Sequence, residues 1–133
     1  MDTDKMFFED RSRYPLAETV ERFTEEAAKA GWRIIHTHDL QQTMSKNGFL
    51  VKPIEVLELC NPRFAHKLLS DDGLKIYASM MPCRIAVYEK EDGCVYLSRM
   101  NNGAFAGLIG GTVEEVMTEA YRQVETFVAA VAE

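Results

Sequence analysis

The sequence predicts a single α/β (α+β) domain over residues 1–133, a two-layer sandwich in which helices cover at least one face of one sheet of about five strands. Two periodicities lead to this prediction. Apolar residues recur at steps of three and four over 16–30 and 113–131, as in amphipathic helices, and they alternate with other residues over 83–88 and 94–100, as in strands. A chain of 133 residues also suits one domain with a sizeable core.

The N-terminal part is expected to form a strand, a helix and a second strand. Residues 5–13 contain apolar side chains followed by alternating charges, which is typical of an edge strand because charges discourage further pairing. Pro15 opens a helix with one apolar stripe, and Gly31 ends it. Residues 32–38 leave room only for a strand before Asp39.

A short helix and a longer strand follow. Asp39 caps a helix that continues through Lys46 and ends at Asn47-Gly48. The next strand runs from residue 49 or 50 to Cys60. It is broken or bent at Pro53, because proline has no amide hydrogen to donate to the ladder.

The stretch after this strand predicts the start of a helix. Asn61 suits the N-cap, where its side-chain oxygen accepts a first-turn amide, and Pro62 suits the first helical position, where no amide hydrogen is needed. The helix continues through Leu69 and is broken by residues 70–73. Residues 74–80 have room for one more helical turn.

Residues 83–88 and 94–100 form the clearest hairpin, with a three-residue loop at 91–93. This loop length places four aliphatic residues on the face toward the helices, namely Ile85, Val87, Val95 and Leu97. The opposite face then carries Arg84, Ala86, Tyr88, Tyr96 and Ser98.

The C-terminal part is expected to be a glycine-rich loop and one long helix. Residues 101–111 lack the Gly-Lys-Ser/Thr ending of a phosphate-binding loop, so they are interpreted as an apolar connection over the sheet. Thr112 and Glu115 form a capping box for the last helix. The predicted order of elements is β-α-β-α-β-α-β-β-α.

Composition excludes several partners. A formal charge of −6 and a pI near 5.1, with no basic run, argue against nucleic acid and against an anionic membrane surface. No apolar stretch approaches the ~20 residues of a membrane-spanning helix, and the start of the chain does not resemble a signal peptide. A cytoplasmic, reducing location is expected, in which the three cysteines remain thiols.

Cys60 and Cys83 are the first candidates for a functional site. Each stands at the end of an expected strand beside a proline, so we expect the two to lie close together at one end of the sheet. Cys60 also precedes a helix N-terminus, which favours a thiolate and makes Cys60 the candidate nucleophile, redox centre or metal ligand. The alternative is that both are small buried residues that fill the end of the sheet.

Histidines and methionines offer weaker candidates. His36 and His38 share a strand face and would complete a metal site with His66 or Cys60, but surface histidines are the favoured interpretation and no metal is assigned. Met80-Met81 would line an adaptable apolar pocket or a soft-metal site, with core filling favoured.

Glu58 lies between two leucines of its strand, so its carboxylate needs water or a partner. Arg84 and Arg99 are the candidate partners, and structural pairing is the favoured role.

The sequence resembles the family called domain of unknown function 302, whose fold class is known as TT1751-like. The residues that carry the resemblance are Leu59-Cys60-Asn61-Pro62, Ala65, Leu68, Pro82-Cys83, Ile85-Ala86-Val87-Tyr88-Glu89, Gly93-Cys94-Val95 and Ser98, with Glu18-Thr19-Val20, Gly31-Trp32 and Asp39 upstream. Met81 and Arg84 depart from the family's pattern, in which leucine and asparagine are usual. The resemblance implies a small, often self-associating α/β domain with no established activity. The sequence does not identify a cofactor.

These observations favour a homodimeric domain that binds a small ligand or a partner near the two cysteines. The candidate ligand-binding residues are Cys60, Asn61, Arg63, His66, Cys83 and Arg84. A thiol-dependent redox or sulfur-handling enzyme that uses Cys60 is the alternative, and a purely structural assembly module is the third possibility. The hairpin face that carries Tyr88 and Tyr96 is expected to contribute to the dimer interface, because it is too apolar for a wholly solvated surface. The alternatives are that the short helix after Asp39 or the glycine-rich loop covers this face within one chain.

Overall fold

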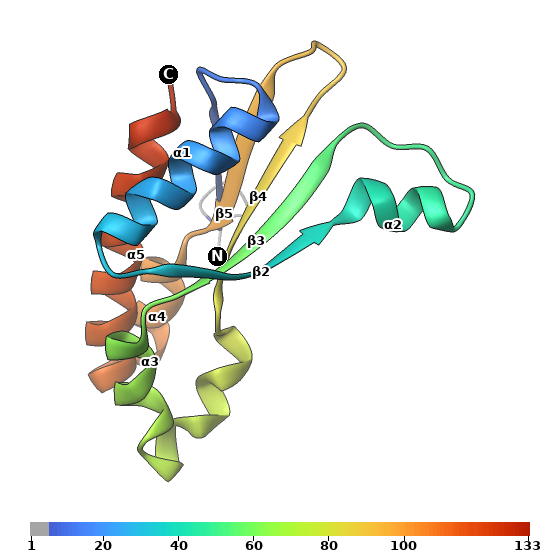
Figure 1. Ribbon diagram of the computed structural model, residues 1–133. Coiled ribbons are helices and arrows are strands. Elements are labelled where there is room, and N and C mark those ends of the chain that lie inside the picture. Colours follow the sequence, from blue (N-terminus) through green and yellow to red (C-terminus); the bar gives the residue numbers. More distant parts are fainter. Residues whose placement is uncertain (1–5) are drawn as a thin grey trace.

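The computed structural model describes residues 6–133, so Lys5 of the expected edge strand lies outside the described part. One antiparallel sheet has the strand order β1-β5-β4-β3-β2, which confirms that the first strand is an edge strand. Figure 1 shows this sheet with most helices on one side. The strands are β1 (Phe7–Arg11), β2 (Arg33–Asp39), β3 (Ile54–Cys60), β4 (Cys83–Glu89) and β5 (Val95–Met100).

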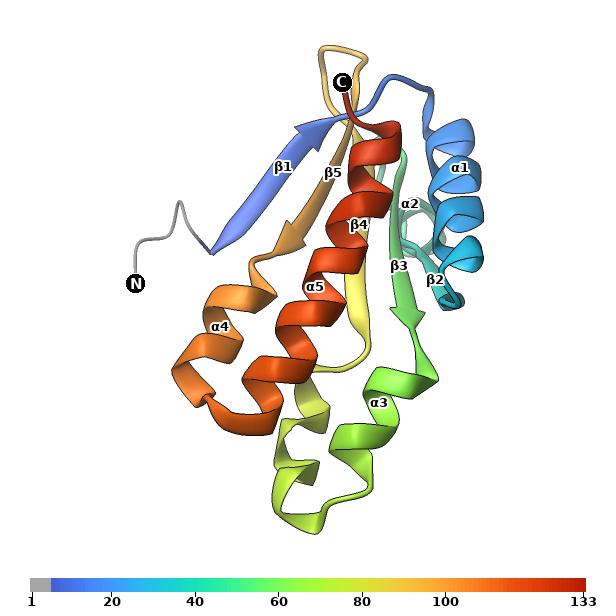
Figure 2. The same ribbon diagram turned by 90° about the vertical axis from the view of Figure 1, so that its left-hand side faces the viewer.

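The helices form the second layer, which confirms the predicted two-layer α/β architecture. In Figures 1 and 2, α1, α3, α4 and α5 lie on one side of the sheet, and α2 lies on the other side beyond the end of β2. Across residues 6–133, no helix is both long and apolar enough to span a membrane. The helical segments are α1 (Leu16–Lys29), α2 (Leu40–Lys46), α3 (Pro62–Leu69), the 3₁₀ segment η2 (Asp72–Met80), α4 (Asn102–Ile109) and α5 (Gly111–Val131).

The main core lies between the sheet and the pair α1 and α5. The apolar stripes of these helices meet at Phe23 and Phe127, whose rings pack edge to face with centroids 6.0 Å apart. Alternation along β4 and β5 turns four residues toward them, as expected, and all four are buried: Ile85, Val87, Val95 and Leu97. A smaller apolar cluster joins α3, α4 and α5 through Leu68, Ala106, Val113, Val116 and Met117.

Arg99 on β5 forms ion pairs with α5 and with the edge strand β1. It is therefore not the partner of Glu58. Its Nε and Nη2 donate to the Glu125 carboxylate at 2.7 and 2.6 Å, and its Nη1 donates to Asp10 Oδ2 at 2.6 Å. The bidentate geometry matches the planar guanidinium to the carboxylate. The residue is only 8% exposed, so these two carboxylates satisfy a buried charge.

Two expectations about segment boundaries in the first part of the molecule are corrected. Residues 49–53 are not part of a strand, and β3 begins only after Pro53, whose carbonyl oxygen accepts the Glu89 amide at 3.0 Å. The helical turn expected over 74–80 begins at Asp72, because the Asp71 side chain caps it by accepting the Gly73 amide.

The expectation of a loop over residues 101–111 is also wrong, because most of this segment forms α4. The Asn101 side chain caps this helix by accepting the Ala104 amide at 3.2 Å, and Ala106 is fully buried against its neighbours. Gly110 ends α4 and also precedes α5, with a φ of 76° that glycine adopts without strain. The α5 helix therefore begins at Gly111 with no side-chain cap, so the expected capping box of Thr112 and Glu115 is wrong.

Truncation of a central core residue tests this arrangement. Leu57 is fully buried on β3, so we expect Leu57→Ala to lower the free energy of unfolding by about 2–5 kcal/mol, measured by urea denaturation. Leu108→Ala is the matched control, because this leucine is 74% exposed. Its effect should stay within about 0.5 kcal/mol, and equal losses in the two variants would contradict the placement of the core.

Candidate functional site

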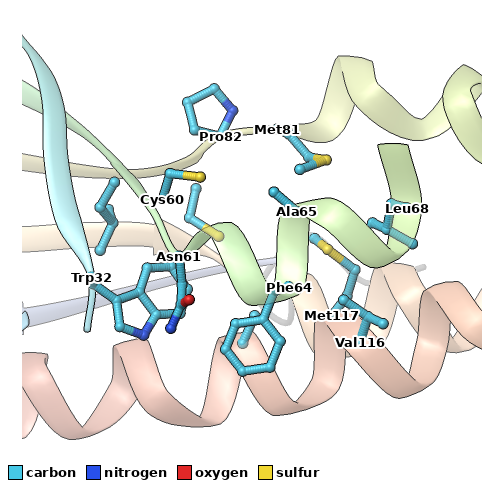
Figure 3. A pocket seen from close by; sticks show the side chains of 13 residues that line it. Trp32, Cys60, Asn61, Phe64, Ala65, Leu68, Met81, Pro82, Val116 and Met117 are labelled. Atoms are coloured by element: carbon cyan, nitrogen blue, oxygen red, sulfur yellow. The ribbon is translucent and has the colours of Figure 1, made fainter. Parts of the chain in front are cut away.

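An apolar cavity of about 30 Å³ lies where β3 passes into α3 and where β4 begins. Figure 3 shows Cys60 and Met81 beside this space, with Met117 contributed by α5. Its volume is enough for one or two water molecules. The residues that line it are Trp32, Leu59, Cys60, Asn61, Phe64, Ala65, Leu68, Met81, Pro82, Cys83, Val116, Met117 and Ala120.

The strand register brings the two cysteines together. Leu59 of β3 pairs with Cys83 of β4, so Cys60 follows one residue beyond that pair, and both cysteines line the cavity. The expectation that they lie close together at one end of the sheet is therefore confirmed. Cys60, Cys83 and Cys94 are all unbridged.

Burial keeps both thiols at the cavity in the protonated form. Burial raises the pKa of the Cys60 thiol above its ordinary value. Burial and the nearby Cys60 thiolate together raise the pKa of Cys83 to about 11. The expectation that the helix N-terminus stabilises a Cys60 thiolate is therefore wrong.

The capping of α3 explains this result. The Arg63 amide donates to Asn61 Oδ1 at 3.1 Å, and the amides of Phe64 and Ala65 donate to the Asn61 carbonyl oxygen at 3.0 and 3.1 Å. Pro62 has no amide hydrogen. Every first-turn amide that would bind an anion thus has a partner within the cap, so desolvation dominates at Cys60.

A second, outer hollow of about 170 Å³ borders the first space, since Pro82 and Cys83 line both. Its remaining lining residues are Ser79, Met80, Arg84, Met100 and Asn102. The hollow is therefore less apolar than the inner cavity. The two spaces share Cys83, so a ligand in either one would contact this residue.

Glu58 connects this region to β2. Its Oε1 accepts the Arg84 Nε–H at 3.3 Å and lies 2.8 Å from His38 Nε2. The hydrogen bonds from His38 and Arg84 lower the pKa of the Glu58 carboxyl. Arg84 is thus the partner that the sequence offered for Glu58.

The six candidate ligand-binding residues divide into three groups. Cys60, Asn61 and Cys83 line the inner cavity, and Cys83 and Arg84 line the outer hollow. Arg63 and His66 are exposed on α3 and line neither space.

The His36 and His38 rings do lie together, with centroids 4.3 Å apart. Within residues 6–133, no cluster of three or more His, Cys, Asp or Glu side chains is arranged to hold a metal ion.

The model of one protein family, described as "Domain of unknown function DUF302", matches residues 8–131. The chain belongs to this family. Its fold is similar to the crystal structure of an uncharacterized conserved DUF302 protein from Bacillus stearothermophilus, with a TM-score of 0.84 and 17% sequence identity over 95% of this chain and 98% of that one. No curated protein matches the sequence. The comparisons confirm the resemblance seen in the sequence and assign a fold to the DUF302 domain.

The sequence offered Met80 and Met81 as pocket residues, and Met81 lines the cavity while Met80 lines the outer hollow. Sequence reasoning missed the aromatic wall of the cavity in this DUF302 domain and the methionine that α5 contributes. Trp32 is 3% exposed, its ring lies 5.8 Å from that of Phe64, and its Nε1–H donates to Gln123 Oε1 at 2.8 Å. The helical period does place Met117 on the inner stripe of α5. The periodicity of the helix does not show that α5 passes the junction of β3 with α3. Met117 was therefore not expected beside Cys60.

The raised thiol pKa values predict slow alkylation. In variants that retain one cysteine each, we expect the iodoacetamide rate of Cys83 to rise tenfold per pH unit and to level off only near pH 11, because only the thiolate reacts. Cys60, whose pKa is raised less strongly, should react faster than Cys83 at any pH below that plateau. A plateau for Cys83 below pH 9 would contradict the burial that the structure shows.

Proposed function

We propose that this DUF302 domain is a homodimeric binding protein whose small ligand occupies the site around Cys60 and Cys83. The observation that carries the proposal is the apolar cavity, which shares Pro82 and Cys83 with the outer hollow. Protein interiors are close-packed, and a void at the junction of two strands, a helix and a distant helix is unusual. Concave sites with few polar groups are the common form of ligand pockets.

The chemistry of the walls limits the ligand. Apolar cavities of this kind stay dry and take up soft, polarisable guests. The outer hollow adds one cation, Arg84, and the amide of Asn102 at its rim. The inner cavity therefore suits a small, soft ligand, and polar groups are available to a ligand only in the outer hollow.

Binding is favoured over thiol catalysis. A nucleophilic cysteine needs a thiolate near neutral pH, and burial raises the pKa of both thiols at the site. A cytoplasmic location completes the proposal, because a reducing compartment keeps the three free cysteines as thiols.

Xenon tests whether the cavity accepts a soft guest. Under xenon pressure, we expect amide proton–nitrogen correlation spectra to change at residues 60–68 and 81–84, because these segments line the cavity. Ala65→Leu, which extends a side chain into the cavity, should abolish these changes. Ala65→Val adds less volume and serves if the larger change prevents folding.

Ala28→Leu is the matched control, because Ala28 is exposed on α1. This variant should keep the full response to xenon. Shifts spread evenly over the domain, or an unchanged response in Ala65→Leu, would refute the ligand cavity.

The proposed dimer uses the sheet face that α1 and α5 do not cover. Tyr88 and Tyr96 lie on it as a pair with nearly parallel rings whose centroids are 6.3 Å apart, and their hydroxyls bond Glu9 and Asp92 respectively. These bonds satisfy the polar ends and leave the rings partly exposed for contact.

A second copy of this chain is the partner that the charges of this face favour. Paired strand positions there carry two acids, Glu9 and Glu58, and three bases, Arg11, Arg33 and Arg84, whereas the whole chain has a formal charge of −6. A twofold interface needs a self-complementary patch, and nearly balanced charges avoid repulsion between two copies.

The segment after α2 adds apolar area on the same side of the sheet. Phe49, Leu50 and Val51 are 63%, 95% and 42% exposed. Figure 1 shows α2 and this connection extending away from the sheet on the side opposite α1. Exposed apolar patches of this kind mark interaction sites, so we include the segment in the interface.

Light scattering after gel filtration tests the dimer. We expect the wild type to have twice the chain mass of 15.1 kDa, and both Leu50→Glu and the double variant Tyr88→Glu, Tyr96→Glu to be monomeric because a charge would be buried at the interface. Leu108→Glu on α4 is the control at a 74% exposed leucine and should stay dimeric. A monomeric wild type at micromolar concentration, or dimers in all variants, would refute this interface.

A further inference from the structure

Sulfur atoms are concentrated around the inner cavity. Cys60 ends β3, Cys83 begins β4, Met81 lies between η2 and β4, and Met117 belongs to α5, yet all four side chains line one space of about 30 Å³. Figure 3 shows the side chains of Cys60, Met81 and Met117 around it. Three segments that are distant in the sequence, at Cys60, at Met81 with Cys83, and at Met117, thus contribute two thiols and two thioethers to the same small volume.

We propose that this cavity binds a single Cu(I) ion through the sulfur atoms of Cys60, Cys83, Met81 and Met117. This inference rests on the proposed ligand-binding function and specifies the ligand. Thiolates and thioethers are soft donors that select Cu(I) among the biological metal ions. The volume suits one dehydrated ion and excludes an organic metabolite.

The walls of the cavity agree with a soft, weakly hydrated ion. The other lining residues are apolar except for Asn61, whose side-chain oxygen is used by the α3 cap. Carboxylates are absent from the lining, so it offers Mg²⁺ and Ca²⁺ none of the oxygen ligands that they prefer. Zn²⁺ prefers thiolate, imidazole or carboxylate ligands, and the lining provides only the two thiols of that set.

Charge and protons balance without a redox step. Each thiol that coordinates the ion releases its proton to solvent, so one Cu(I) with two thiolates and two neutral thioethers forms a complex with a charge of −1. Copper and sulfur keep their oxidation states.

The outer hollow supplies a route to the site. Met80 and Met100 line it together with Cys83, which also lines the inner cavity. A Cu(I) ion that arrives in the hollow therefore meets two thioethers before it reaches the shared thiol. Transfer from one sulfur to the next avoids release of the bare ion to water.

Anaerobic titration with Cu(I) against the competing chelator bicinchoninate tests the proposal. We expect one equivalent to bind to the wild type, with only sulfur neighbours in the X-ray absorption spectrum of the bound copper. Cys60→Ser and Cys83→Ser should each weaken binding at least about 100-fold, and the double variant Met81→Leu, Met117→Leu about tenfold. Cys94→Ser is the control, because Cys94 lies beside the hairpin loop and lines neither space.

Several results would overturn the proposal. They are binding that survives both Cys60→Ser and Cys83→Ser, an equal loss in Cys94→Ser, Zn²⁺ binding as tight as that of Cu(I), and full affinity in the double methionine variant. The methionine variant conserves side-chain volume and gives a result even if a serine variant does not fold. Xenon uptake without Cu(I) binding would refute the metal and keep the ligand cavity, whereas the loss of both would refute both.

Discussion

The antiparallel register of β3 against β4 is the constraint on which the rest of this structure depends. Leu57 pairs with Ile85 and Leu59 pairs with Cys83. These residues belong to, or pack against, the core cluster that α1 and α5 share with the sheet. A slip of one residue would turn every inward side chain to the other face, so burial of the leucines enforces the register. The same register sets Cys60 one residue beyond the last pair, and the two thiols meet as a consequence of core packing.

The cap of α3 explains why the two thiols at this site stay protonated. Asn61 satisfies the first-turn amides with its side chain and its carbonyl oxygen, so the helix begins cleanly and offers no free donor to an anion. Desolvation then controls the thiols, and burial raises both pKa values. A site of neutral, buried sulfur suits the binding of a soft guest better than nucleophilic attack on a substrate.

The two faces of the sheet have different roles. One face carries the core and leaves the cavity at its end, where α5 passes the junction of β3 with α3 (Figure 2). The other face carries the tyrosine pair and the group in which Arg84 and His38 contact the Glu58 carboxylate. Arg84 also borders the outer hollow, so a contact on the open face would reach the mouth of the ligand site through this one side chain.

The sequence by itself determined the amphipathic helices α1 and α5, the β4–β5 hairpin with its inner and outer faces, and the capped start of α3. These signals act over a few residues, through periodicity, turn length and side-chain caps. The same local reasoning failed over 101–112, because α4 is stabilised by its packing on α5, in which Ala106 is buried. A single residue, Gly110, links the two helices. Only the tertiary structure decided that Met117 and Trp32 line the cavity with Cys60 and Cys83, and that the thiols of these two cysteines stay protonated. The physical reason is that the walls of a cavity, and the desolvation of the groups in it, depend on segments far apart in the chain.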